Sequence, residues 1–205
     1  MKCTINIYEV STERDNKLRA FAAVTFDDNF KVTGITIREG RSGNLYVSMP
    51  QYPTGEKDEQ NKPVYTDVFF PKTTDFSTTL RGGILAAYED REEGKKQVDF
   101  IYGEEDFDYY ISVSNNKDLS NTTKAFVRLV INDVFVVNQI SVKRSFAGNN
   151  FVAMPSQRRM IDGKADYQDI CYPVTKIFHD KLQEDIMRHY EKNQEKARAA
   201  AEKAR

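Results

Sequence analysis

The chain has 205 residues, of which 40 % are hydrophobic and 12 % aromatic, enough for a packed core and too many for a disordered chain. No apolar run approaches the roughly 18 residues that span a membrane, and the first ten residues lack the apolar centre of a secretion signal. Its two cysteines are too few for a disulfide framework. We therefore expect a cytoplasmic protein that does not associate with membranes.

Short segments rich in β-branched and aromatic residues predict strands in the first half of the chain. They cover residues 8–10, 21–26, 31–39 and 45–49, and the turn residues at 27–30 predict a hairpin. After Pro71 the apolar residues recur every four positions, which predicts a helix with one apolar face, capped by Thr73 or Thr74. This face consists of Phe76, Leu80, Ile84 and Tyr88.

Two glycines, Gly82 and Gly83, interrupt this predicted helix. Each costs roughly 1 kcal/mol relative to alanine inside a helix. Either they are tolerated sequence drift, or another backbone approaches the helix closely at this point.

The second half of the chain repeats the first. Shifted by 105 residues, Arg19–Pro50 aligns with Lys124–Pro155 without a gap, and 11 of the 32 pairs are identical where ordinary composition gives ~2. After the shared Met-Pro the shift becomes 102, so the first copy has three extra residues in a predicted loop at 51–65. The second helix repeats the apolar spacing behind Thr175, at Phe178, Leu182, Ile186 and Tyr190.

These patterns predict an α+β protein built from two tandem units, each a small antiparallel β-sheet followed by one amphipathic α-helix. The predicted boundaries are a first unit at 1–90, an acidic linker at 91–107, a second unit at 108–191 and a charged helical tail at 192–205. The end of the tail has no apolar face, so we expect it to be solvated or frayed unless a ligand orders it.

The second copy resembles the SpoVG family of bacterial septation and sporulation regulators. The resemblance rests on an Asp-x-Phe-Val-Val hairpin, a small-Met-Pro-Ser-x-Arg stretch, an Asp-Gly turn, an aromatic-x-Asp-Ile strand, and then a proline and a helix. The residues that carry it are Asp133, Phe135, Val136, Val137, Ile140, Val142, Phe151, Val152, Met154, Pro155, Ser156, Arg158, Asp162, Gly163, Asp169, Ile170 and Pro173. The first copy keeps the skeleton but lacks the serine and arginine after Met-Pro.

The resemblance implies a regulator of cell division or sporulation that binds DNA or RNA, with no catalysis and no cofactor. Members of the family usually have one unit and form homodimers. The two units here are therefore expected to pair within the chain as a pseudo-dimer, with further homo-oligomers left open. The family pattern also places nucleic-acid contacts in the basic residues after Met-Pro and on the helix.

The charge distribution points to the second unit. Residues 1–108 hold 14 Lys/Arg and 20 Asp/Glu, a net charge of −6, whereas residues 109–205 hold 16 and 11, a net charge of +5. A basic half is typical of phosphate binding. The candidate nucleic-acid-binding residues are Arg158, Arg159, Lys164, Lys143, Arg144 and Arg188. The alternative for each is an ordinary solvated surface charge, and the acidic linker could also cover the basic surface.

Four aromatic positions could be base-stacking platforms, namely Tyr46, Phe151, Tyr65 and Tyr167. They alternate with apolar strand residues, so we expect them in the core instead, together with Cys171. His179 and His189 lie ten residues apart on one helix and cannot share a metal. No catalytic or metal-binding motif stands out. The alternative function is a protein–protein interaction module that docks through residues 51–65.

Overall fold

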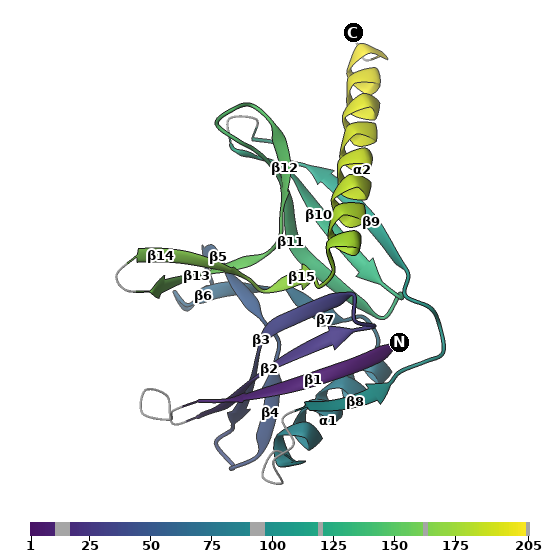
Figure 1. Ribbon diagram of the computed structural model, residues 1–205. Coiled ribbons are helices and arrows are strands. Elements are labelled where there is room, and N and C mark those ends of the chain that lie inside the picture. The colour runs from purple at the N-terminus through teal and green to yellow at the C-terminus, as the bar shows by residue number, and fades with distance from the viewer. Residues whose placement is uncertain (11–16, 91–96, 119–120, 162–163, 204–205) are drawn as a thin grey trace.

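The computed structural model describes residues 1–10, 17–90, 97–118, 121–161 and 164–203, apart from the side chains of residues 159–161 and 201. The described chain forms two antiparallel sheets, two projecting hairpins and two helices (Figure 1). The predicted α+β class is confirmed. The strands are β1 (Lys2–Glu9), β2 (Leu18–Phe26), β3 (Phe30–Glu39), β4 (Leu45–Ser48), β5 (Gln51–Lys57), β6 (Pro63–Asp67), β7 (Phe69–Pro71), β8 (Gln97–Ile101), β9 (Tyr109–Asn115), β10 (Thr123–Ile131), β11 (Phe135–Arg144), β12 (Asn150–Ala153), β13 (Ser156–Ile161), β14 (Lys164–Asp169) and β15 (Cys171–Pro173).

The two helices are α1 (Thr74–Asp90) and α2 (Lys176–Lys203). The repeat is visible in these bounds, because β10, β11 and β12 reproduce β2, β3 and β4 at a shift of 105, and β15 reproduces β7 at a shift of 102. The start of α2 likewise follows the start of α1 by 102 residues. The offsets in the sequence are thus offsets between equivalent elements of structure.

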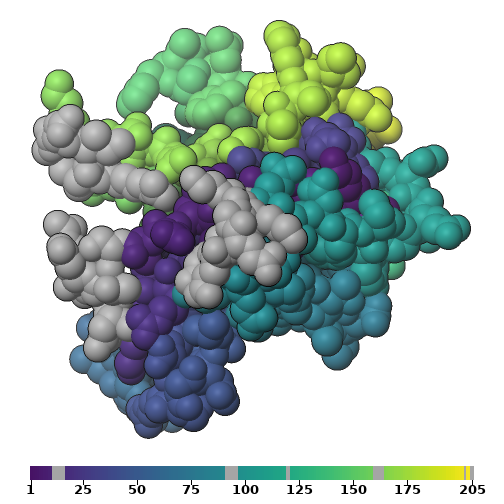
Figure 2. All heavy atoms as spheres, turned by 60° about the horizontal axis from the view of Figure 1, so that its bottom comes forward, coloured from purple at the N-terminus to yellow at the C-terminus, as the bar shows by residue number. Residues whose placement is uncertain are grey.

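Each sheet takes one short strand from the other half of the chain. The first sheet has the order β15-β3-β2-β1-β8, with β4 also on β3. The second has the order β12-β11-β10-β9, with β7 also on β11. Hence β7 of the first half pairs with β11, and β15 of the second half pairs with β3. In Figure 2 the purple and blue atoms of the first half adjoin the green and yellow atoms of the second half.

The core continues across this junction. The ring of Phe135, from the second half, lies 4.4 Å from that of Phe26, 5.2 Å from that of Phe69 and 6.0 Å from that of Phe76, centroid to centroid. All four side chains are fully buried. One hydrophobic core therefore serves both halves, and each half contributes side chains that the other encloses.

The predicted helix faces, caps and turns are confirmed. The residues that recur every four positions are buried in both helices, from Phe76 to Tyr88 and from Phe178 to Tyr190. The hydroxyls of Thr73 and Thr175 each accept a hydrogen bond of 3.2 Å from the backbone N–H three residues on. In both main hairpins the two turn residues have positive φ, as a two-residue turn requires.

Gly83 and Gly82 have different surroundings. A Cβ added to Gly83 would lie 3.1 Å from Cε1 of Phe100, a side chain of β8, whereas one added to Gly82 would meet nothing within 4 Å. The close neighbour of the helix is therefore a side chain of the first sheet and not another backbone.

Three sequence-based expectations need correction. The four aromatic residues Tyr46, Phe151, Tyr65 and Tyr167 are exposed rather than buried, with 45 to 65 % of each accessible, because they lie on sheet and hairpin faces that no helix covers. The predicted loop at 51–65 is largely the hairpin β5–β6. Part of the acidic stretch, residues 97–101, forms β8 and extends the first sheet beside β1, while residues 91–96 lie outside the described residues. Cys171 is fully buried, as predicted.

The tail after residue 191 continues α2. Asn193 donates a hydrogen bond of 3.0 Å to the carbonyl oxygen of Val113, and Gln194 donates one of 2.9 Å to the side chain of Asn115, so the start of the tail is held against β9. Nearly all described residues beyond it are exposed. No helix in the described part of the chain is long and apolar enough to cross a membrane.

Candidate nucleic-acid interface

The Met-Pro step ends a strand and begins a hairpin in both halves. The carbonyl oxygen of Pro155 accepts a hydrogen bond of 2.7 Å from the N–H of Ile170, and that of Pro50 accepts one of 3.0 Å from the N–H of Val68. These bonds close the bases of β13–β14 and β5–β6. Both hairpins project to the same side of the molecule from the junction of the two sheets (Figure 1).

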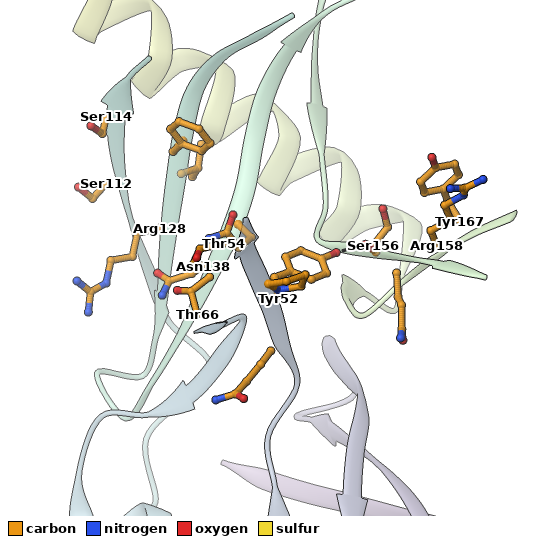
Figure 3. Close-up of a pocket in the computed structure, with 16 residues that line it drawn as sticks. Tyr52, Thr54, Thr66, Ser112, Ser114, Arg128, Asn138, Ser156, Arg158 and Tyr167 are labelled. Atoms are coloured by element: carbon orange, nitrogen blue, oxygen red, sulfur yellow. Dashed lines mark hydrogen bonds between the residues drawn. The ribbon is translucent and has the colours of Figure 1, made fainter. Parts of the chain in front are cut away.

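A groove of about 940 Å³ lies between the open face of the second sheet and these hairpins. Side-chain alternation explains the open face: Tyr109 and Val113 on β9 turn toward α2, so Ser112 and Ser114 turn away from it. The register places Arg128 opposite Ser112, and Phe126 opposite Ser114, on the same open face. In Figure 3 these serines and Arg128 lie on one side of the groove, and Arg158 and Tyr167 lie on the other.

Both halves of the chain build the groove. Gln51, Tyr52, Thr54 and Thr66 come from the first hairpin, and Arg158 comes from the second. The Tyr52 hydroxyl donates a hydrogen bond to the backbone oxygen of Ser156, which ties the two hairpins together (Figure 3). Burial of this hydroxyl raises the pKa of Tyr52 to about 12, so it remains a donor throughout the neutral range.

A second hollow of about 310 Å³ adjoins the groove. The two share Tyr52, Phe126, Gln139, Ser156 and Tyr167 as lining residues. The smaller hollow adds Lys143 of β11.

The charged side chains that line the two hollows are all positive. The lining of the two hollows contains three cations, Arg128, Lys143 and Arg158, and no aspartate or glutamate among the described residues. Within the described chain none of these cations takes part in an ion pair. Arg128 stacks over the ring of Phe70 at 5.8 Å, which fixes its guanidinium beside the groove. The arrangement can bind an extended anion.

The family model for SpoVG matches residues 1–90 and 109–192, most of the chain. The chain belongs to the SpoVG family.

Several curated SpoVG relatives carry the name "Putative septation protein SpoVG". That of Alkaliphilus oremlandii is 36 % identical over 85 residues, which cover 42 % of this chain and 82 % of the relative. That of Alkaliphilus metalliredigens is 35 % identical over 89 residues, or 43 % of this chain and 82 % of the relative. The protein of Lachnospira eligens is 42 % identical over 69 residues, which cover 34 % of this chain and 74 % of the relative. No solved structure matches the chain significantly.

The two SpoVG segments differ where the groove is charged. Arg158 pairs with Tyr167 in its hairpin as Pro53 pairs with Tyr65, the equivalent of Tyr167, in the first segment, and Arg128 stands where the first has Ala23. Both cations therefore belong to the second SpoVG segment alone.

The six predicted contact residues do not form one cluster. Arg158 lines the groove and Lys143 lines the adjoining hollow. Arg144 follows Lys143 but lies on the opposite face of β11, near α2. Its Nε donates a hydrogen bond of 3.1 Å to the backbone oxygen of Gly148. Arg188 lies on α2 and is ion-paired with Asp185, on the covered side of the sheet. Lys164 is exposed at the start of β14, at the far end of its hairpin. The backbone of Arg159 pairs with that of Asp166, and its side chain lies outside the described residues.

Sequence reasoning missed Phe126 and Arg128. Phe126 recurs as Phe21 in the first copy and alternates with the buried Ala125 and Val127, a pattern that can place it on an uncovered face. Arg128 occupies a strand position where the first copy has a small apolar residue. A search for charge differences between the two copies along their strands, and not only in their loops, would have found it.

Potential metal-binding side chains do not cluster in the described chain. No group of three or more histidine, cysteine, aspartate or glutamate side chains there could hold a metal ion. His179 hydrogen-bonds instead to its helix neighbours Asp180 and Gln183.

Proposed function

We propose that this SpoVG-family chain is a regulator that binds DNA or RNA through its second unit, in a septation- or sporulation-type process. The observation that carries the proposal is the convergence of Arg128, Lys143 and Arg158 around a groove with no acidic side chain in its described lining. A phosphate backbone is the common biological ligand for such a surface. The names of the curated relatives support the septation part of the proposal.

We further infer that the two units form an intrachain pseudo-dimer, in which the first unit completes the site of the second. The reciprocal pairing of β7 with β11 and of β15 with β3 supports this inference. So does the part that the hairpin β5–β6 takes in the groove wall. No catalytic role, cofactor or membrane partner is part of the proposal, and the protein acts as a binding regulator.

A mobility-shift assay with mixed DNA and RNA probes over a range of salt concentrations tests the binding. Wild-type protein should bind, and its affinity should fall as the salt concentration rises. Arg128→Ala/Arg158→Ala should weaken binding and reduce the slope of log K against log salt by roughly 0.7 to 0.9 per lost phosphate contact. The pair Arg158→Ala/Arg159→Ala tests the basic stretch after Met-Pro in the same way.

Arg41→Ala is the matched control, because Arg41 is an exposed arginine in the turn between β3 and β4 and lines neither hollow. Absence of binding by the wild type at low salt would refute the proposal. An equal loss in Arg41→Ala would refute the assignment of the site.

The second candidate function is docking of a protein partner on the hairpin β5–β6. The observation that favours it is the exposure of most of this hairpin, in which six of the seven β5 residues are exposed. A chain that binds no nucleic acid, and that retains a partner through this hairpin in a pull-down, would support docking.

A further inference from the structure

Exposed aromatic rings accompany the cations on this surface. Phe126 is 47 % exposed, Phe151 45 % and Tyr167 65 %, although aromatic side chains of this size usually contribute to the core. No described helix covers Phe126 and Phe151, because α2 packs on the other face of the second sheet, and Tyr167 lies on the projecting hairpin β13–β14. Rings that are held rigidly on strands and left in solvent are suited to stacking against a flat ligand.

The strand register places a cation beside each ring. Lys143 lies directly opposite Phe151 across β11 and β12, and Arg158 lies directly opposite Tyr167 across β13 and β14. Such cross-strand neighbours have Cβ atoms about 4.5 to 5.5 Å apart. Arg128 follows Phe126 by two residues on the same face of β10. Sites for a flat apolar group and for an anion therefore alternate over the surface.

The remaining lining offers hydrogen-bonding groups of both kinds. Hydroxyl and amide side chains surround the rings, namely Ser112, Ser114, Asn138, Gln139, Thr54 and Thr66. Hydroxyls and amides both donate and accept hydrogen bonds, as the edges of nucleobases require. In a duplex the faces of the bases are stacked on each other and their pairing edges are occupied, so neither the rings nor these groups could reach them.

We propose that the groove and its adjoining hollow bind a single-stranded nucleic acid, with unstacked bases on Phe126 and Tyr167, which line them, and on Phe151, which lies opposite Lys143, and with phosphates on Arg128, Lys143 and Arg158. The inference rests on the proposed function and adds to it the strandedness of the ligand and the residues that stack. A positively charged groove with aromatic platforms is the general solution for such ligands.

The internal repeat provides matched controls. Phe21, Tyr46 and Tyr65 occupy the positions of Phe126, Phe151 and Tyr167 in the first unit and are also exposed, at 37, 47 and 55 %. The first sheet has Ala23 at the position of Arg128. Ring removal at Phe21 or Tyr46, which lie on the first sheet, therefore changes the protein surface similarly but leaves the cationic groove intact.

The experiment measures the affinity of the full chain for 12-nucleotide probes by fluorescence anisotropy. The probes are a deoxy and a ribo single strand of mixed sequence, and the corresponding duplexes. The variants are Phe126→Ala, Tyr167→Ala and Tyr167→Phe, with Phe21→Ala and Tyr46→Ala as controls on the first sheet. Circular dichroism establishes that each variant is folded. Photo-crosslinking of probes with 5-iodouracil then identifies the aromatic residues in contact.

We expect single strands to bind at least tenfold more tightly than the duplexes. Phe126→Ala and Tyr167→Ala should each weaken single-strand binding by about 5- to 150-fold, the range for loss of one stacked base. Tyr167→Phe should bind like the wild type because its ring is retained, and the controls should change affinity less than twofold. Comparison of the affinities for the DNA and RNA single strands shows which sugar the protein prefers.

Duplex binding equal to or tighter than single-strand binding would overturn the inference. Equal losses in Phe126→Ala and Phe21→Ala, or crosslinks confined to residues outside the groove, would also overturn it. In these cases salt-sensitive binding that requires Arg128 and Arg158 would leave the proposed function standing. Absence of binding to every probe would refute both the inference and the proposed function.

Discussion

At the scale of single residues, the sequence identifies the buried side chains better than the exposed ones. Phe76, Leu80 and Cys171 are buried where the pattern predicts, since helical spacing defines one covered face. Tyr167 and Phe151 were expected in the core and are exposed. Alternation along a strand shows that neighbouring side chains lie on opposite faces of a sheet, but it does not show which face a helix covers.

Both thiols are expected to be unreactive in the folded protein. Cys3 and Cys171 are fully inaccessible, and burial raises the pKa of Cys3 to about 12 and that of Cys171 further. Only the thiolate reacts rapidly. A chromogenic thiol reagent at pH 8 should therefore modify no cysteine in native protein and both in denaturant. Rapid native modification would contradict the burial.

The same shifts predict lower stability in alkali. A thiol whose folded pKa is raised contributes its full stability below the unfolded value near 9 and loses it as pH rises toward the folded pKa, because only the unfolded chain then releases the proton. Burial raises the pKa of Tyr52 in the same direction. Urea midpoints should thus be constant from pH 6 to 8 and fall between about pH 9 and 12. An increase over that interval would refute the argument.

At the scale of elements, the sequence patterns do not predict strand β8, because it lies in an acidic stretch. The acidic composition of 91–107 favours a linker, yet within β8 the half-buried Val98 and Phe100 alternate with the exposed Gln97, Asp99 and Ile101. Five residues in an acidic context give too short a pattern to distinguish from chance. The sequence also does not predict the three-residue strands β7 and β15, because their partner strands lie more than 60 residues away and no local pattern specifies them.

The two helix glycines provide a test of packing against helix propensity. Gly82→Ala should raise the free energy of unfolding by up to about 1 kcal/mol, since its Cβ would enter open space. Gly83→Ala should gain less or lose stability, because its Cβ would lie 3.1 Å from Phe100. Chemical denaturation of the two variants measures the difference. Equal stabilisation would show that Phe100 moves aside freely.

At the scale of the whole molecule, the two units of the repeat contribute different parts of the groove. The first unit keeps the scaffold and supplies a wall of the groove through Tyr52, Thr54 and Thr66. The second unit carries the cations Arg128, Lys143 and Arg158. A covalent pair permits this division, because the two halves can diverge separately, whereas two copies of one chain must present identical surfaces.

The exchange of β7 and β15 predicts that neither half folds alone. A chain of residues 1–108 lacks the partner of β7 and the Phe135 ring that packs against Phe26, and a chain of residues 109–205 lacks the partner of β15. Each separate half should therefore expose core side chains and show weak, non-cooperative unfolding. Mixed or co-expressed halves should form a one-to-one complex with the circular dichroism spectrum of the intact chain.

Size-exclusion chromatography with light scattering, together with urea denaturation, measures both outcomes. A half that is monomeric and unfolds cooperatively would contradict the shared core. A half that is cooperative only as a homodimer would instead show that it can replace its partner with a second copy of itself. In that case both halves would be folded, but they should differ in nucleic-acid binding, because only the second half has the serine and arginine after Met-Pro. This comparison would separate the structural role of each unit from its binding role.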